Sequence, residues 1–109
     1  MKMLTGFTVR EKVIEDKFQH NELKKFKVIS RRNHLFGLWV AKQLGYDEAQ
    51  TEALAHELML SYLDDPSSQN LLDYAIRELA KNNIVFSAYQ LKKELEYFDK
   101  EAVQQMIKE

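Results

Sequence analysis

The sequence has no cysteine, one proline, three glycines and one tryptophan among its 109 residues. The missing cysteine excludes disulfides and thiolate chemistry, so we expect a reducing compartment, the cytoplasm. The scarcity of proline and glycine leaves long stretches available for helices. No apolar run approaches the roughly 20 residues of a membrane-spanning helix, and we expect no insertion into a membrane. A content of 45% hydrophobic and 30% charged residues is typical of one globular domain.

Capping signals mark where helices begin and end. Thr8 to Glu11 and Ser87 to Gln90 are capping boxes, in which the first side chain accepts from a backbone amide and the last side chain returns the bond. Asp47 to Gln50 has the same spacing and opens another helix. Gly45 and the pair Asn82–Asn83 are typical of left-handed helix ends. These signals predict a first helix over residues 8–44 and no sheet.

Apolar residues at helical spacing follow each start. The second helix should end at Asp65 because Pro66 disfavours helical geometry in its predecessor, and Ser67 or Ser68 should cap the third. Short connections predict that sequential helices pack antiparallel. The expected core positions are Phe18, Phe26, Ile29, Phe36, Val40, Leu44, Leu54, Ala55, Leu58, Tyr62, Leu71, Leu72, Ala75, Ile76, Leu79, Leu91, Leu95, Phe98, Ala102 and Met106. The predicted fold is all-α, a single-domain four-helix bundle.

The first predicted helix is longer than the others need. At about 1.5 Å per residue it reaches roughly 55 Å, against roughly 22–32 Å for the rest. We therefore divide the single domain 1–109 into an overhanging N-terminal arm, 1–18, and a helical bundle, 19–109. On a helical wheel the arm has apolar sides with cations between them, formed by Phe7, Val9, Val13, Ile14 and Phe18 with Arg10 and Lys17. Two interpretations follow: a frayed, solvated terminus, or a segment that docks in an acidic groove of a partner.

Charge is segregated along the chain. Residues 23–46 contain six cations and no anion, whereas 47–109 contain six cations and thirteen anions. The simplest explanation is that a basic first helix docks on acidic neighbours. The alternatives are an anionic ligand, an acidic protein surface, or a nucleic acid. A sequence pI near 6.3 argues against a dominant phosphate-binding surface, so we expect no nucleic acid partner.

No catalytic pattern emerges. His56-Glu57 begins like a zinc-protease motif, but Leu60 stands where the second histidine would be, so we predict no metal site. We therefore predict that the protein is not an enzyme. The stretch around Gly37 has two readings. It is a tight helix crossing with Asn33 bonded to a neighbour and Trp39 in the core, or a nucleotide pocket in which Arg31 or Arg32 meets phosphate.

Residues 9–45 resemble the zeta-subunit family of alphaproteobacterial ATP synthase inhibitors, which are small four-helix proteins. The most specific part of the resemblance is Phe26, Arg31-Arg32-Asn33, Gly37-Leu38-Trp39, Ala41 and Leu44-Gly45. The N-terminal segment of the family is matched by Arg10-Glu11-Lys12, Glu15, Lys17-Phe18 and His20. The chain departs from the family at Thr8-Val9, which replaces a more acidic pair, and at Val13-Ile14, which replaces an Ala-Phe-like pair.

The resemblance implies an inhibitor of ATP hydrolysis that works by contact with the alpha, beta and gamma subunits of the ATP synthase head. Its N-terminal segment would enter an alpha/beta catalytic interface beside gamma and block rotation. The implied partner contacts are Phe7, Arg10, Glu11, Lys12, Val13, Ile14, Glu15, Lys17 and Phe18. We expect a monomer when free, peripheral association with the membrane-bound synthase, and no cofactor beyond weak binding of an adenine nucleotide at Arg31, Arg32, Asn33 and Trp39. The alternative is a nucleotide-sensing or nucleic-acid-binding helical module that does not inhibit ATPase activity.

Overall fold

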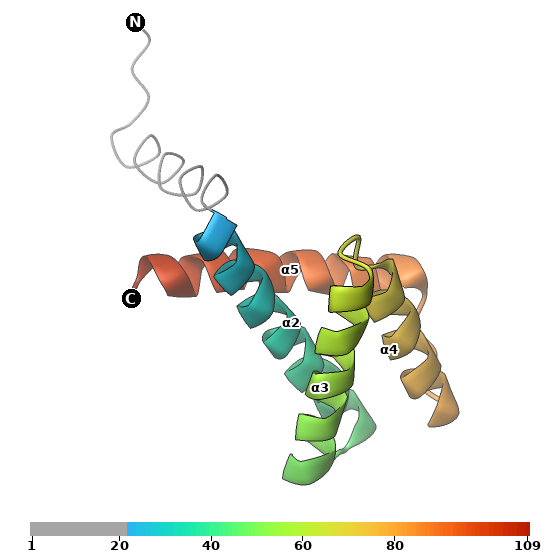
Figure 1. The fold of residues 1–109 in the computed structure, drawn as a ribbon. Coiled ribbons are helices and arrows are strands. Elements are labelled where there is room, and N and C mark those ends of the chain that lie inside the picture. Colours follow the sequence, from blue (N-terminus) through green and yellow to red (C-terminus); the bar gives the residue numbers. More distant parts are fainter. Residues whose placement is uncertain (1–21) are drawn as a thin grey trace, which may run out of the picture.

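A computed structural model describes residues 22–109 of the chain as four helices (Figure 1). They are α2 (Glu22–Leu44), α3 (Glu48–Asp64), α4 (Gln69–Lys81) and α5 (Ala88–Ile107). The described residues contain no strand. The predicted all-α, four-helix class is confirmed. The predicted helical span 8–21 lies outside the described residues.

The first three described helices alternate in direction, as predicted, whereas α5 runs across them (Figure 1). The connection 82–87 returns along α4, so that α5 can begin beside the start of α4. From there α5 extends toward the described start of α2, and the C-terminus lies near that start. The main contacts of α2 are therefore with α3 on one side and with α5 on another.

The helix ends follow the predicted local chemistry. Asp47 Oδ1 accepts from the Gln50 amide at 2.8 Å, and Ser87 Oγ accepts from the Gln90 amide at 3.1 Å. Both Gln side chains complete the capping box. Gly45 ends α2 with φ of 70°, and Asn83 follows α4 with φ of 63°, a conformation that Gly and Asn adopt most readily.

The two serines predicted to cap α4 divide that role between them. Ser68 occupies the N-cap position, but its φ is 73° and its side chain makes no capping hydrogen bond. Its hydroxyl instead accepts from Arg32 Nη2 at 3.1 Å, while Ser67 Oγ accepts from the Gln69 amide at 3.3 Å. The Ser68 hydroxyl therefore binds Arg32 of α2 and does not cap the backbone of α4.

The hydrophobic core has two parts. The larger part joins all four helices and centres on six fully buried side chains, Phe36, Val40, Leu58, Leu71, Leu79 and Leu91. The smaller part joins the first half of α2 to the end of α5 through Val28, Ala102 and Val103. Val103, which is 6% exposed, was missing from the predicted core.

Two aromatic residues of α2 differ in how far the structure covers them. Phe26 is 51% exposed, because none of the described helices covers it near the described start of α2, so its prediction as a core residue was wrong. Trp39 is partly buried and packs against the main core, in agreement with its predicted place there. It packs at the edge of the main core, stacked on Phe36 with ring centroids 6.1 Å apart and meeting the edge of Phe86 at 5.3 Å.

Gly37 marks the close crossing of α2 and α3, as predicted. A Cβ atom at this position would lie 3.3 Å from Leu58 Cδ1 and 3.7 Å from the Ala55 backbone. Asn33, one turn earlier, is 3% exposed. Its Oδ1 accepts from Arg32 Nε at 3.0 Å, and its Nδ2 has no hydrogen-bond partner among the described residues. The predicted hydrogen bond of Asn33 is therefore made within α2, not across the helix crossing.

Candidate functional site

The predicted partner contacts in the N-terminal segment lie outside the described residues. They are Phe7, Arg10, Glu11, Lys12, Val13, Ile14, Glu15, Lys17 and Phe18. The described part of the chain starts at Glu22, within α2. The candidate functional site in the described part therefore has two components, the start of α2 and the surroundings of Arg32.

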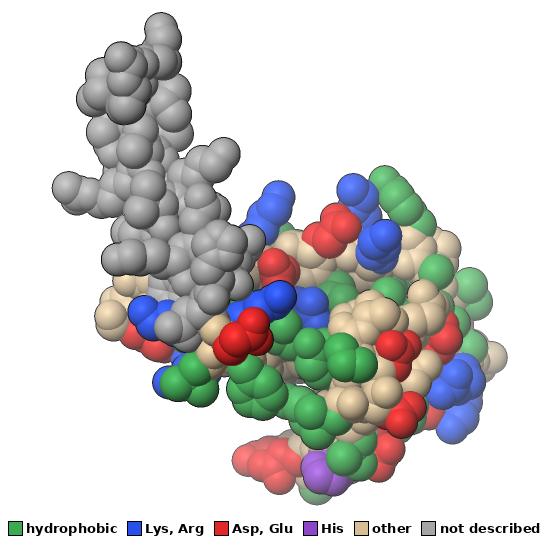
Figure 2. All heavy atoms as spheres, turned by 45° about the horizontal axis from the view of Figure 1, so that its top comes forward, with side chains coloured by type: hydrophobic (Ala, Val, Ile, Leu, Met, Phe, Trp, Pro, Cys, Tyr) green, Lys and Arg blue, Asp and Glu red, His purple; other side chains and the backbone are tan. Residues whose placement is uncertain are grey.

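The start of α2 is exposed on all sides. Every residue from 22 to 27 is exposed, including Leu23 at 63% and Phe26 at 51%. Lys24, Lys25 and Lys27 lie in the same two turns. Figure 2 shows basic side chains gathered where the described chain begins, with hydrophobic side chains beside them. This end of the molecule presents apolar side chains among cations.

The next turns of α2 are fastened to α5. Val28 packs on Ala102 and Val103, and Arg31 Nη1 forms an ion pair with Glu109 Oε2 at 2.6 Å. Both side chains of the pair remain partly exposed, so the pair itself contributes about 0–1 kcal/mol. The apolar contacts of Val28 therefore do most to hold this part of α2 against α5.

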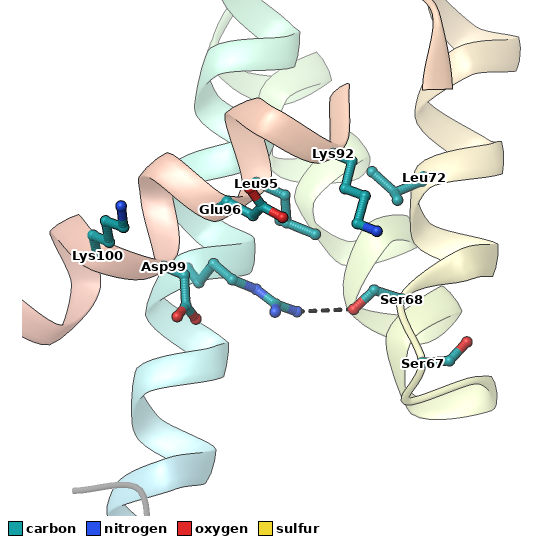
Figure 3. A pocket seen from close by; sticks show the side chains of 9 residues that line it. Ser67, Ser68, Leu72, Lys92, Leu95, Glu96, Asp99 and Lys100 are labelled. Carbon is teal, nitrogen blue, oxygen red and sulfur yellow. Dashed lines mark hydrogen bonds between the residues drawn. The ribbon is translucent and has the colours of Figure 1, made fainter. Parts of the chain in front are cut away.

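Arg32 has a more enclosed setting than Arg31. Its guanidinium donates to Ser68 Oγ, the bond drawn in Figure 3, and to Asn33 Oδ1, and it lies 5.6 Å from the centroid of the Tyr62 ring. Burial lowers the pKa of Arg32, while the nearby carboxylate of Asp99 opposes that shift. Because an arginine side chain stays protonated in proteins, this site carries a fixed positive charge.

A cavity of about 400 Å³ opens beside Arg32 between α2, α4 and α5. Figure 3 shows Lys92 and Asp99 extending from α5 on one side, with Ser67 and Ser68 before α4 on the other. The complete lining is Arg32, Ser67, Ser68, Leu72, Lys92, Leu95, Glu96, Asp99 and Lys100. Three cations and two carboxylates thus share one cavity, an arrangement that can hold a small anion only where the cations are not already paired.

The structure does not bring the four predicted nucleotide contacts together. Arg31 is paired with Glu109, Asn33 is buried, and Trp39 packs on Phe36 and Phe86 without lining the cavity. Arg32 alone of the four lines it. Sequence reasoning missed Ser68, Lys92 and Lys100, because nothing in the local pattern of α5 indicates which of its polar residues faces α2.

The described residues offer little for other kinds of site. Within 22–109 there is no group of three or more His, Cys, Asp or Glu side chains placed to hold a metal ion. In the same range no helix is both long and apolar enough to cross a membrane.

Two arginines of α2 lie near acidic residues of α5 and the C-terminus, as the segregation of charge predicts. Arg31 pairs with Glu109, and Arg32 lies near Asp99.

Comparison with protein families gives one match, which covers nearly the whole chain. The model of the family ATPase inhibitor subunit zeta matches residues 3–105. No curated protein and no solved structure matches the chain. The match includes residues 3–21 before α2, the helices α2, α3 and α4, and α5 up to residue 105. It agrees with the resemblance seen in residues 9–45, and the chain belongs to the ATPase inhibitor subunit zeta family.

Proposed function

We propose that this protein inhibits ATP hydrolysis by the ATP synthase head through residues 1–18, which insert at an alpha/beta catalytic interface beside the gamma subunit. The observation that carries the proposal is the family match over residues 3–105, because the family is one of ATPase inhibitor subunits and the match includes most of this segment. The described helices would anchor the C-terminal end of this segment.

The composition of the segment suits a docking role. Val13, Ile14 and Phe18 supply apolar area, and each such side chain contributes about 1.5–3 kcal/mol when fully buried in a partner. That gain must first offset the entropy of ordering the segment, about 1–2 kcal/mol per residue for the backbone. Arg10 and Lys17 add charge that favours an acidic receiving groove.

The described fold supplies an anchor for that role. The start of α2 is exposed, whereas the turns from Val28 onward are held by α5 and then by α3. A partner that binds residues 1–18 would therefore bind a segment that is linked to packed helices. Among the described residues the buried core begins at Val28, so we expect inhibition and folding to be separable.

The test is ATP turnover by a synthase head stripped of its own inhibitor, with protein added across a concentration series. We expect the full chain to inhibit and a chain lacking residues 1–17 to lose most inhibition, with the thermal midpoint nearly unchanged. Equal inhibition by both chains would contradict the role of the segment. Absence of inhibition by the full chain would contradict the function itself.

A charge-reversal pair refines this experiment. Arg10→Glu with Lys17→Glu should weaken inhibition if the groove is acidic. The matched control is Lys42→Glu with Arg77→Glu, which makes the same change in net charge at two exposed positions on α2 and α4. Equal weakening by both pairs would show that only net charge matters.

We propose as a second function that Arg32 binds the phosphate of an adenine nucleotide weakly. The cavity beside it carries Lys92 and Lys100 in addition, which favours an anionic ligand over a neutral one. Titration of ADP should shift the amide signals of residues near 32, 68 and 92, and the shifts should shrink at high salt. Lys92→Gln should weaken the response and Lys42→Gln should not. The absence of shifts at millimolar ADP would contradict this function.

A further inference from the structure

The apolar face of α2 continues beyond the helix that covers it. At 100° per residue, Phe26 lies within about 20° of Gly37, and Leu23 lies at the same angle as Ala41. Gly37 and Ala41 are buried, and Gly37 faces Ala55 and Leu58 of α3. Leu23 and Phe26 therefore extend the side of α2 that packs on α3, but they are 63% and 51% exposed.

The reason for their exposure is the length of α3. Gly37 approaches Leu58, and Arg32 lies over Tyr62, so the antiparallel pairing advances by about one residue on each helix. α3 ends at Asp64, which places its last residue opposite about residue 30 of α2. Phe26 and Leu23 lie about 4 and 7 residues farther, or roughly 6–10 Å beyond the end of α3.

Chain connectivity places this surface close to the proposed docking segment. Leu23 follows Phe18 by five positions, a stretch of chain that spans at most about 18 Å when fully extended. Any partner that binds residues up to Phe18 therefore comes within reach of the first turns of α2.

The charge of the surface indicates the chemistry of what covers it. Lys25 and Lys27 flank the apolar pair, and residues 23–46 contain no anion. A complementary surface would be apolar at its centre and acidic at its rim. A second copy of the same surface would bring like charges together, which disfavours a symmetric dimer.

We infer that Leu23 and Phe26 form a second contact with the acidic partner surface that receives residues 1–18. This inference rests on the proposed function and deepens it, because it extends the interface from the N-terminal segment into the folded helices. Residues 1–18 would insert into the partner, and the first described turns of α2 would contact the partner surface around the point of insertion.

The test compares two double variants that each remove two exposed apolar side chains. Leu23→Ser with Phe26→Ser removes the proposed contact. Val85→Ser with Tyr89→Ser is the matched control, because these residues are 87% and 68% exposed and lie near the start of α5, at the opposite end of that helix from the start of α2 (Figure 1). Both variants should melt near the parent.

In the ATP turnover assay, the first variant should require an at least tenfold higher concentration for half inhibition, equivalent to about 1.4 kcal/mol. The control should stay within about twofold. Unchanged inhibition by the first variant would overturn the inference, while strong inhibition by the parent and its loss without residues 1–17 would leave the proposed function intact. Failure of the parent to inhibit would instead remove the proposed function, and the inference with it.

Two other measurements test different occupants of the surface. Sedimentation of the parent and of the first variant reports self-association, and a dimer lost only in that variant would overturn the inference in favour of a second copy. Thermal melts test the chain's own N-terminal segment. A destabilisation by Leu23→Ser with Phe26→Ser that disappears when residues 1–17 are deleted would also overturn it.

Discussion

On the side of α2 that faces α3, the two halves of the helix have the same apolar spacing but differ in what covers them. In the second half, Phe36 and Val40 are fully buried beneath α3, α4 and α5. In the first half, Leu23 and Phe26 are more than half exposed, although they lie on the same side of the helix as Gly37 and Ala41. Apolar periodicity therefore identifies one face of a helix but does not show which other helices pack on it.

The strongest test of this comparison replaces one phenylalanine in each half. Phe36→Ala should cost about 3–5 kcal/mol, because it opens a cavity in the main core. Phe26→Ala should change stability by no more than about 0.5 kcal/mol, because the side chain already faces solvent. Thermal melts measure both, at about 4–8 °C per kcal/mol for a domain of this size. Similar losses for the two variants would show that the first half of α2 is covered in solution.

The helix crossing at Gly37 gives the next largest effect. Gly37→Leu should cost about 1–3 kcal/mol, since the added atoms would push Leu58 and the Ala55 backbone away. Gly37→Ala is the control. Its Cβ would lie 3.3 Å from the flexible end of Leu58, and alanine gains about 0.8–1 kcal/mol of helix propensity over glycine, so the two terms nearly cancel. Chemical denaturation of both variants distinguishes crowding from propensity, and a neutral leucine variant would contradict the close crossing.

Arg31 and Arg32 lie between the two halves of α2. Arg32→Met should cost about 1–2 kcal/mol, because Ser68 and Asn33 lose a donor and the buried amide of Asn33 is then without partners at both ends. Arg31→Met should cost at most about 1 kcal/mol, because its ion pair with Glu109 is partly exposed. Urea unfolding curves measure the two. A larger loss at Arg31 would reverse the assignment of the enclosed arginine.

The smallest effect concerns the turn at Asp65 to Ser67, which follows α3. Hydrogen bonds from the Ser67 hydroxyl and amide hold the pKa of Asp65 below its ordinary value. A depressed carboxyl pKa stabilises the fold above the unfolded-state pKa, near 4, and that stabilisation is lost as pH falls through the lower folded-state value. Asp65→Asn should therefore melt slightly below the parent at pH 7 and approach it below pH 4. A difference that grows on acidification would contradict this role.

Local sequence determined most of the helix boundaries. The capping boxes at Asp47 and Ser87, the left-handed ends at Gly45 and Asn83, and the stop before Pro66 each depend on residues within one turn of the boundary. Such interactions join groups that are close in sequence, so the local pattern predicts them. For the same reason the apolar stripes of α4 and α5 identified most of their buried positions, although Val103 was missed.

Of the candidate site, too, sequence predicts one part and not the other. Its residue types near the N-terminus, and the family to which the chain belongs, follow from sequence. The cavity beside Arg32 does not, because it brings Arg32 to Ser68, 36 positions away, and adds residues of α4 and α5.

Only the tertiary structure decided which apolar and basic residues have neighbours. Ser68 gave its hydroxyl to Arg32 in place of the cap of α4, because a buried guanidinium needs an acceptor. Trp39 lies at the edge of the core, and Phe26 lies beyond the end of α3. The burial of each side chain depends on where the neighbouring helices end and cross. Residue types and spacing therefore fixed the helices and their apolar faces, whereas the lengths and crossings of those helices selected which part of each face stayed exposed.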